Sequence, residues 1–255
     1  MAASPIAAAR RARRELIARS RPAGEFDASR YFRGGHGLRF LNVGSSQVRA
    51  MAEAVVREHA GTWSVDDAMA FANALMPDRA LEVKGVAIEV VGRYRRSFRP
   101  ALLRAWKRWL SRNYASNWAT TDTMCGLLIG PLLLDRPALT AQMRDWSKDR
   151  NMWVRRASAV ALIASLRRGL GLDLGYDIAA RLHADGEDLI QKAVGWMLRE
   201  AGKADPIRLE RYLRANGRGI PRTTLRYAIE RFPEAKRKAL LRATSRNARR
   251  RVPRR

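Results

Sequence analysis

The sequence predicts an all-α protein built from stacked helix pairs, and three observations lead to that prediction. Apolar residues recur at helical spacing along nearly all of the 255 residues, and almost no segment alternates as a strand does. Helix-capping residues also recur, because Asp78, Asn117, Asn151 and Glu187 follow one another at intervals of about 34–39 residues. This period suits a solenoid of HEAT-like helix pairs, in which each pair buries its apolar face against the next. A simple helix bundle is the competing architecture, and the regular spacing favours the solenoid.

In the first half of the chain, each helix is expected where an apolar stripe follows a capping signal. Ser64 and Asp67 have the spacing of a capping box. Asp78 is the expected N-cap of the helix over residues 78–96, and Asn117 is the expected N-cap of the helix over residues 117–128. The expected helices of this half cover residues 45–59, 64–75, 78–96, 98–112 and 117–128.

In the second half of the chain, capping residues, glycine and proline again mark where the expected helices begin and end. Asn151 is the expected N-cap of one helix, Gly169 follows its end, and Pro206 stands in the first turn of a later helix. The expected helices cover residues 135–149, 151–168, 187–203, 205–217, 221–232 and 233–244. We predict one helical domain over residues 1–243 and a basic, flexible tail over residues 244–255.

The charge balance indicates a polyanionic partner. The chain has 50 Lys and Arg residues against 24 Asp and Glu residues, a formal net charge of +26. A GC-rich genome would explain arginine in place of lysine but not the excess of positive charge, so nucleic acid is the first candidate partner. The concave surface of the solenoid is then expected to form a basic DNA-binding groove.

Other classes of site find little support in the composition. The single cysteine, Cys125, excludes an intrachain disulfide, and three dispersed histidines give no metal-ligand spacing. The longest apolar run contains only ten residues and is interrupted by Pro131, too short to span a bilayer. The N-terminus does not have the pattern of a secretory signal. We expect a monomer without metal or cofactor, in the cytoplasm of a bacterium and associated with the nucleoid.

Tryptophans accompanied by a charged residue about one helical turn away are the candidate functional residues. This spacing places the members of each set on one helix face. A structural reading is open for every set, since tryptophan is commonly a core residue and ion pairs are commonly structural. That reading is weakest for Asp122, which lies past the first turn and cannot be an N-cap. The sets are Trp118 with Asp122, Trp153 with Arg156, and Trp196 with Lys192 and Arg199.

The segments NWATTD, WVRRASAV and IQKAVGWMLRE, in this order, resemble the bacterial DNA alkylation-repair glycosylases of the AlkD type, which are built from HEAT-like repeats. The earlier segment RYFRGGHGLRFLNV is similar to the N-terminal part of that family, and the resemblance extends from about Tyr31 to Pro206. The resemblance implies an enzyme that removes cationic alkylated purines, such as 3-methyladenine and 7-methylguanine, from double-stranded DNA. It also implies excision without a base-flipping pocket.

The resemblance assigns roles residue by residue. It implies that Asp122 is the catalytic aspartate and that Trp118 and Trp196 face the lesion. A phosphate-contacting arginine falls within WVRR; Arg156 is the assignment made here, and Arg155 remains open. The remaining expected DNA contacts are Trp153, Lys192, Arg199 and Tyr31. The family often has a second aspartate where this chain has Ala119, so Asp122 is the only acid of its segment.

The implied chemistry is consistent with these residue types. An N-alkylated purine is already positively charged, so it leaves without a general acid and the sugar becomes an oxocarbenium-like cation. A carboxylate stabilises that cation and orients water, while indole faces attract cationic groups. Two alternatives fit the same sequence. One is a non-catalytic HEAT-repeat protein that binds branched or distorted DNA, and the other is a HEAT-repeat scaffold that binds acidic proteins.

Overall fold

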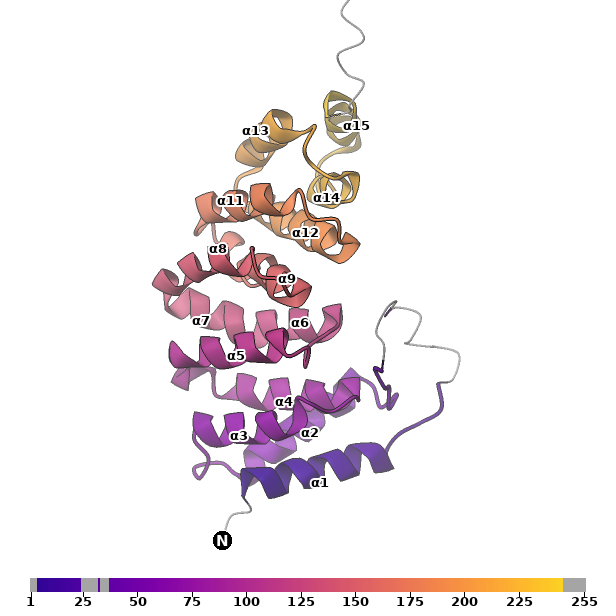
Figure 1. Ribbon diagram of the computed structural model, residues 1–255, viewed down its shortest axis with the longest axis vertical. Helices are drawn as coiled ribbons and strands as arrows, with labels where there is room; N and C mark the ends of the chain where they lie inside the picture. Colours follow the sequence, from indigo (N-terminus) through magenta and orange to yellow (C-terminus); the bar gives the residue numbers. More distant parts are fainter. Residues whose placement is uncertain (1–3, 24–31, 33–36, 245–255) are drawn as a thin grey trace, which may run out of the picture. The chain divides into compact units, whose positions relative to one another are not determined.

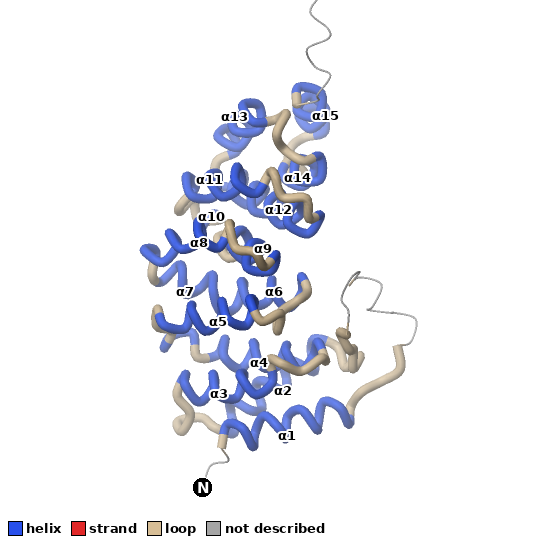
Figure 2. Tube along the Cα trace, viewed as in Figure 1, coloured by secondary structure: helices blue, strands red, loops and turns tan. Residues whose placement is uncertain are grey.

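The computed structural model describes residues 4–23, 32 and 37–244, and these residues form helices joined by loops (Figures 1 and 2). No strand occurs among them, although an isolated bridge pairs Arg39 with Ala80. The structure therefore confirms the predicted all-α, helical-repeat class. The chain divides into two compact units, Met1–Asp135 and Arg136–Arg255.

In the described part of the first unit, the five helices α1 to α5 have 11–14 residues each, and the shorter elements α6, η3 and α7 follow them. Helix α2 packs on α4, α1 packs on α3, and α4 also contacts α6 (Figure 1). Its core includes the fully buried side chains of Phe71, Ile88 and Trp106. The elements are α1 (Pro5–Ala18), α2 (Ser45–Glu58), α3 (Val65–Leu75), α4 (Leu81–Arg93), η2 (Arg95–Ser97), α5 (Ala101–Ser111), α6 (Trp118–Met124), η3 (Cys125–Ile129) and α7 (Gly130–Asp135).

A buried lysine ties three segments of this unit together. The Lys84 Nζ donates hydrogen bonds to the carbonyl oxygens of Met76 and Tyr114, both at 2.7 Å. Burial lowers the pKa of Lys84 to about 8, partly offset by the charge of Asp78. The ammonium group thus has a structural role, because it satisfies carbonyls at the ends of two neighbouring segments.

Helices α6 and α7 are continuous through η3, which is one turn of π-helix. In this turn the Gly130 N–H donates to the Cys125 carbonyl oxygen, five residues back. Such wide turns often occur at functional sites in helical proteins. The helix therefore runs past Pro131 to Asp135, further than the predicted end at residue 128.

The second unit is arranged around its longest helix, α12, which contacts α9, α11, α13 and α14. The N-caps Asn117 and Asn151 were predicted correctly, and Glu187 precedes α12 as expected. The elements of this unit are η4 (Pro137–Ala141), α8 (Gln142–Trp146), α9 (Met152–Val160), α10 (Ile163–Leu166), α11 (Leu172–Leu182), α12 (Asp188–Ala204), α13 (Pro206–Asn216), α14 (Arg222–Ala228) and α15 (Glu234–Ala243).

Gly195 allows a close approach of helix α14 to helix α12. A Cβ atom at this position would lie 2.5 Å from the Tyr227 Cβ and 2.7 Å from the Thr224 carbonyl oxygen. The Thr224 hydroxyl donates to the Gln191 carbonyl oxygen at 2.9 Å. Helix α14 is thereby held against α12 over the segment Gln191–Gly195, directly before Trp196.

Several sequence predictions about elements were wrong. The helix expected over residues 135–149 is instead the 3-10 helix η4 followed by the short helix α8. Asp78 is not an N-cap: α4 begins at Leu81, and the Asp78 carboxylate instead accepts hydrogen bonds from the Ala80 N–H at 2.7 Å and the Arg13 Nε at 2.5 Å. The helix expected over residues 151–168 is interrupted after Val160 and resumes as α10. Helices α1 and α11 were not predicted. The expected basic tail beyond Thr244 lies outside the described residues.

Candidate nucleic-acid interface

The start of helix α6 places Trp118 and Asp122 on one stripe of the first unit. Asn117 fixes this start, because its Oδ1 accepts the Thr120 N–H at 2.8 Å and its Nδ2 donates to the Thr120 Oγ1 at 2.9 Å. Trp118 is 36% exposed, and Asp122, one turn later, is half-buried. The local sequence therefore sets an indole and a carboxylate side by side at the surface of the helix.

The threonines on either side of Asp122 are already satisfied by the backbone. The Thr121 hydroxyl donates to the Ala115 carbonyl oxygen, and the Thr123 hydroxyl donates to the Ala119 carbonyl oxygen, both at 2.8 Å. Asp122 is the one carboxylate of α6. The helix thus presents a single ionisable side chain on its exposed side.

Aromatic side chains extend from Trp118 across the first unit. Phe32 stacks on Trp118 with ring centroids 5.3 Å apart and planes 8° apart. Phe32 also contacts Phe40 at a centroid distance of 5.2 Å. Sequence reasoning did not identify Phe32 as a partner of Trp118, although it lies in the RYFRGG segment. Tyr31, the predicted DNA contact in the same segment, lies outside the described residues.

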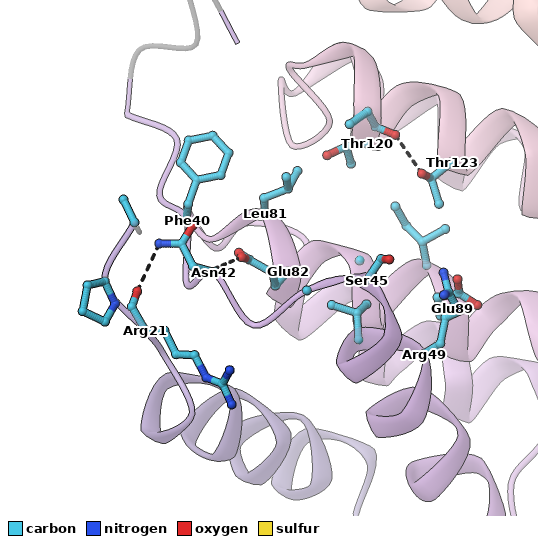
Figure 3. Close-up of a pocket in the computed structure, with 17 residues that line it drawn as sticks. Arg21, Phe40, Asn42, Ser45, Arg49, Leu81, Glu82, Glu89, Thr120 and Thr123 are labelled. Carbon is cyan, nitrogen blue, oxygen red and sulfur yellow. Dashed lines mark hydrogen bonds between the residues drawn. The ribbon is translucent and has the colours of Figure 1, made fainter. Parts of the chain in front are cut away.

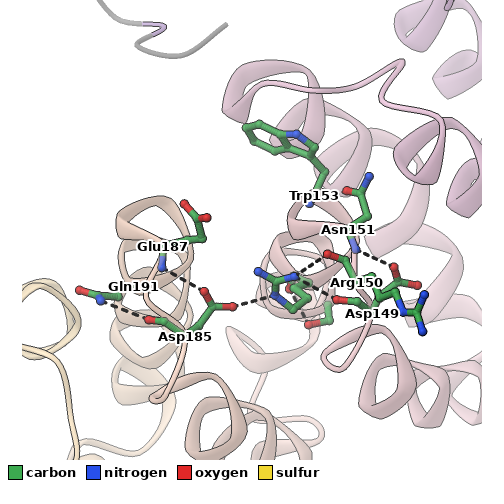
Figure 4. Close-up of polar contacts among 9 residues, drawn as sticks. Asp149, Arg150, Asn151, Trp153, Asp185, Glu187 and Gln191 are labelled. Atoms are coloured by element: carbon green, nitrogen blue, oxygen red, sulfur yellow. Dashed lines mark hydrogen bonds and ion pairs between the residues drawn. The ribbon is translucent and has the colours of Figure 1, made fainter.

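In the second unit, Trp153 begins helix α9 beside its cap. The Asn151 Oδ1 accepts the Trp153 N–H at 2.8 Å, and the Asp149 Oδ1 accepts the Asn151 N–H at 3.0 Å. Trp153 is half-buried, and its ring points away from the polar network around Asp149 and Asp185 (Figure 4). Its indole is therefore not used in that network.

Arg155 holds the loops before α9 and α12 together. Its Nε donates to the Asp185 carboxylate at 2.7 Å, and its Nη1 donates to the carbonyl oxygens of Asp149 at 3.0 Å and Arg150 at 2.9 Å (Figure 4). Through its Nε and Nη1 groups the guanidinium fixes the geometry of these two loops. Arg156 is only 5% exposed and donates to the Leu189 carbonyl oxygen of α12. Both arginines of WVRR thus contact protein groups in this structure.

Helix α12 carries Lys192, Trp196 and Arg199 along one side. The Lys192 Nζ lies 2.7 Å from the Asp188 carboxylate, and that hydrogen bond raises the pKa of Lys192. Trp196 is half-buried. Arg199 pairs with Glu230 and lies 3.4 Å from the Glu200 carboxylate. Two cations therefore flank the indole, each with an acidic partner.

Glu200 is a buried acid that sequence reasoning missed. It is 1% exposed and accepts hydrogen bonds from the Arg167 Nε and the Lys203 Nζ, both at 2.7 Å. Burial would raise the pKa of Glu200, but these hydrogen bonds outweigh it and hold the pKa at about 2. No local pattern reveals this network, because Arg167 is far away in the sequence.

The structure thus groups the predicted residues within each unit. Trp118 and Asp122 share α6 in the first unit. In the second, α9 with Trp153, Arg155 and Arg156 packs on α12 with Lys192, Trp196 and Arg199. Over the described part of the chain, no three His, Cys, Asp or Glu side chains gather as a metal site.

The helices were also compared with the length and hydropathy that a membrane-spanning helix requires. No single helix of the described residues has the length and hydropathy to cross a bilayer, although Trp118–Asp135 and Pro137–Trp146 meet that criterion when counted together.

Comparison with known proteins gives a family and a structural relative. A solved structure described as a predicted DNA alkylation repair enzyme from Enterococcus faecalis matches with a TM-score of 0.69 and 19% sequence identity, covering 78% of this chain and 91% of that chain. At this identity the likeness shows a shared fold. The comparison with curated proteins gives no match. The family model for DNA alkylation repair enzymes matches residues 12–232. The chain therefore belongs to the DNA alkylation repair enzyme family.

Proposed function

We propose that this protein is a monofunctional DNA glycosylase that excises cationic N-alkylated purines, such as 3-methyladenine and 7-methylguanine, from duplex DNA. Its family supports a role in the repair of alkylated DNA. The observation that carries the finer proposal is the Trp118–Asp122 stripe, where a partly exposed indole adjoins the one carboxylate of α6.

The proposed chemistry uses the charge of the lesion itself. As the glycosidic bond breaks, positive charge moves from the alkylated base to the sugar. The Asp122 carboxylate stabilises the developing cation and orients the attacking water. Trp118 and Trp196 offer indole faces to the cationic groups, each contributing about 0.5–2 kcal/mol. No general acid is required, which agrees with a site built around one carboxylate.

Basic side chains bind the phosphates in this proposal. A net charge of +26 favours binding of a polyanion. Lys192 and Arg199 are the proposed phosphate contacts on α12, and their acidic partners Asp188 and Glu230 give way to phosphate. Arg155 acts by holding the loops that present Trp153. Arg156 stays a proposed contact, and reaching a phosphate requires it to leave the Leu189 carbonyl oxygen.

The resemblance noted in the sequence also implies excision without a base-flipping pocket. The proposal therefore includes this feature: the alkylated base is excised without being flipped into a pocket.

The deciding experiment measures release of 7-methylguanine from methylated duplex DNA by the wild type and by Asp122→Asn. We expect the substitution to lower the rate by roughly 10²–10³-fold, the scale of a lost electrostatic stabiliser. Duplex binding should change little. Asp135→Asn is the matched control, since Asp135 is an exposed acid on the same continuous helix. Equal rates for wild type and Asp122→Asn would rule out the assigned role of Asp122.

The second candidate is a non-catalytic protein that binds branched or distorted DNA. The positive charge favours it as much as it favours the enzyme. Tight, salt-dependent DNA binding without base release by the wild type would assign this function instead.

A further inference from the structure

Two cavities of the first unit differ in the charges that line them. The larger has a volume of about 620 Å³, and Figure 3 shows that its lining includes two arginines and two glutamates: Arg21, Arg49, Glu82 and Glu89. These opposite charges balance, so the larger cavity selects neither a cation nor an anion. The smaller has a volume of about 280 Å³ and is lined by Arg108 and Arg112, and no acidic residue of the described chain lines it.

We call the smaller one the Arg108 cavity. Asn73 lines it from α3, and the other polar or aromatic lining residues come from α5 and the turn after α5: Arg108, Trp109, Arg112 and Tyr114. Its volume lies just below the range of about 300–1,000 Å³ that is typical of sites for whole small molecules. A small charged group therefore matches this cavity better than a complete nucleotide does.

The end of α5 shapes one wall of the Arg108 cavity. Asn113 adopts the left-handed conformation, with φ 58°. Its N–H donates to the Leu110 carbonyl oxygen, and the Tyr114 N–H donates to the Trp109 carbonyl oxygen, both at 2.9 Å. This is the pattern of a Schellman motif, in which the residues after a helix satisfy its last carbonyl groups. Two carbonyl oxygens that would repel an anion are thus already occupied.

Two guanidinium groups give the Arg108 cavity its charge. Arg108 and Arg112 are one helical turn apart, so their side chains lie on the same side of the chain. Both are exposed, and within the described residues neither side chain has a hydrogen bond or an ion pair. The C-terminal end of a helix contributes about half a negative charge, which two full positive charges exceed.

A buried lysine adds a third positive charge next to this cavity. The Lys84 Nζ donates to the carbonyl oxygens of Met76 and Tyr114, both at 2.7 Å, and Tyr114 lines the cavity. Burial lowers the pKa of Lys84 to about 8, so the ammonium group is still mostly protonated at neutral pH. The acid nearby in the sequence, Asp78, is already held by the Arg13 Nε at 2.5 Å.

Asn73 adds hydrogen-bond donors to the two guanidinium groups. The Trp109 Nε1 donates to the Asn73 Oδ1 at 2.8 Å. An indole N–H is a donor only, so this bond fixes which end of the carboxamide faces the tryptophan. The Asn73 Nδ2 then keeps its N–H donors, for which the described residues supply no acceptor. Free donors beside two guanidinium groups suit an oxyanion.

We propose that the Arg108 cavity is a binding site for a phosphate group, held by Arg108, Arg112 and the Asn73 amide. A phosphate group presents more acceptor oxygens than the two of a carboxylate, so three side chains can bind it at once. The site shares no residue with the proposed excision site and does not depend on that proposal. The phosphate group belongs either to a nucleic-acid backbone or to a free phosphate compound, and the test separates these two sources.

The test follows the indole N–H signal of Trp109 by NMR while isotopically labelled protein is titrated with inorganic phosphate at constant ionic strength. Trp109→Phe identifies the signal. We expect a saturable shift with a dissociation constant of about 1 mM or below, and binding at least about tenfold weaker when Arg108→Gln and Arg112→Gln are combined. Arg95→Gln combined with Arg96→Gln is the matched control, because these exposed residues carry the same charge and do not line the cavity.

A duplex of unmodified DNA distinguishes the two sources of phosphate. If backbone phosphates occupy the cavity, the duplex shifts the Trp109 signal, and the Arg108/Arg112 double variant binds the duplex at least about fivefold more weakly than the Arg95/Arg96 control. A shift with inorganic phosphate but not with the duplex assigns the cavity to a free phosphate compound.

Three results would overturn the inference. The first is that neither phosphate nor the duplex gives a saturable shift of the Trp109 signal. The second is equal phosphate affinity in the Arg108/Arg112 variant and the control, and the third is acetate binding as tightly as phosphate. Thermal unfolding of each variant checks that the fold is retained, and all four arginines are exposed, so we expect unchanged midpoints.

Discussion

Replacing Glu200 by glutamine removes one buried charge from helix α12 while keeping the shape of the side chain. Glu200 is 1% exposed, and its carboxylate accepts hydrogen bonds from Arg167 and Lys203. The pKa of Glu200 is lowered from 4.5 to about 2. At about 1.4 kcal/mol per pKa unit, this corresponds to roughly 3 kcal/mol of stability. The two cations are half-exposed and can be solvated again in the variant, so we expect a loss of about 2–3 kcal/mol at neutral pH.

The pH dependence gives the sharper test. A carboxylate with a lowered folded-state pKa stabilises fully above its unfolded pKa, and the contribution is lost as pH falls from about 4.5 towards 2. Urea unfolding followed by tryptophan fluorescence at neutral pH and near pH 3 should therefore show a gap between wild type and Glu200→Gln that narrows in acid. Glu234→Gln is the control, since the Glu234–Lys238 pair is exposed and should contribute little. A gap of the same size at both pH values would refute the reasoning.

Two further predictions concern packing and acid stability. Gly195→Ala should lower the free energy of unfolding by about 1–3 kcal/mol, because the added Cβ meets α14, whereas Gly126→Ala, with open space around it, should not; urea unfolding of both variants checks this. Burial lowers the pKa of His183 from 6.5 to about 4, so the unfolded chain binds more protons in that range and wild-type stability should fall as pH drops from about 6.5 to 4. His183→Phe should flatten that part of the profile while losing the hydrogen bond to Tyr212, and an unchanged profile would contradict the assignment.

Local signals in the sequence predicted the helices that depend on local interactions. The capping box of Ser64 and Asp67 forms as expected, and Asn117 and Asn151 cap their helices, because each cap involves residues within four positions. Asp78 has the residue type of a cap but is held by Arg13, which is distant in the sequence. Pro131 suggested an end to the helix, but the π turn before it lets the helix continue.

In the candidate site too, the features set by residues close in sequence could be predicted, and those set by distant residues could not. The Trp118–Asp122 stripe follows from helical spacing alone and could be predicted. The burial of Arg156, the loop contacts of Arg155 and the carboxylate network of Glu200 depend on residues about 30 positions away, so spacing could not reveal them. The two cavities could not be predicted either, since each is lined by segments that are separate in the sequence.

The wide turn at η3 sets the rotational phase of the helix that carries Asp122. A π turn holds one residue more than an α turn, and each residue rotates an α-helix by about 100°. The part before Cys125 can therefore turn Trp118 and Asp122 outward while the part after Ile129 buries Leu132 and Leu133. If the whole helix had regular α geometry, either Trp118 and Asp122 would turn away from the surface or Leu132 and Leu133 would turn away from the core. The extra residue thus separates the orientation of the exposed stripe from the packing of the helix end.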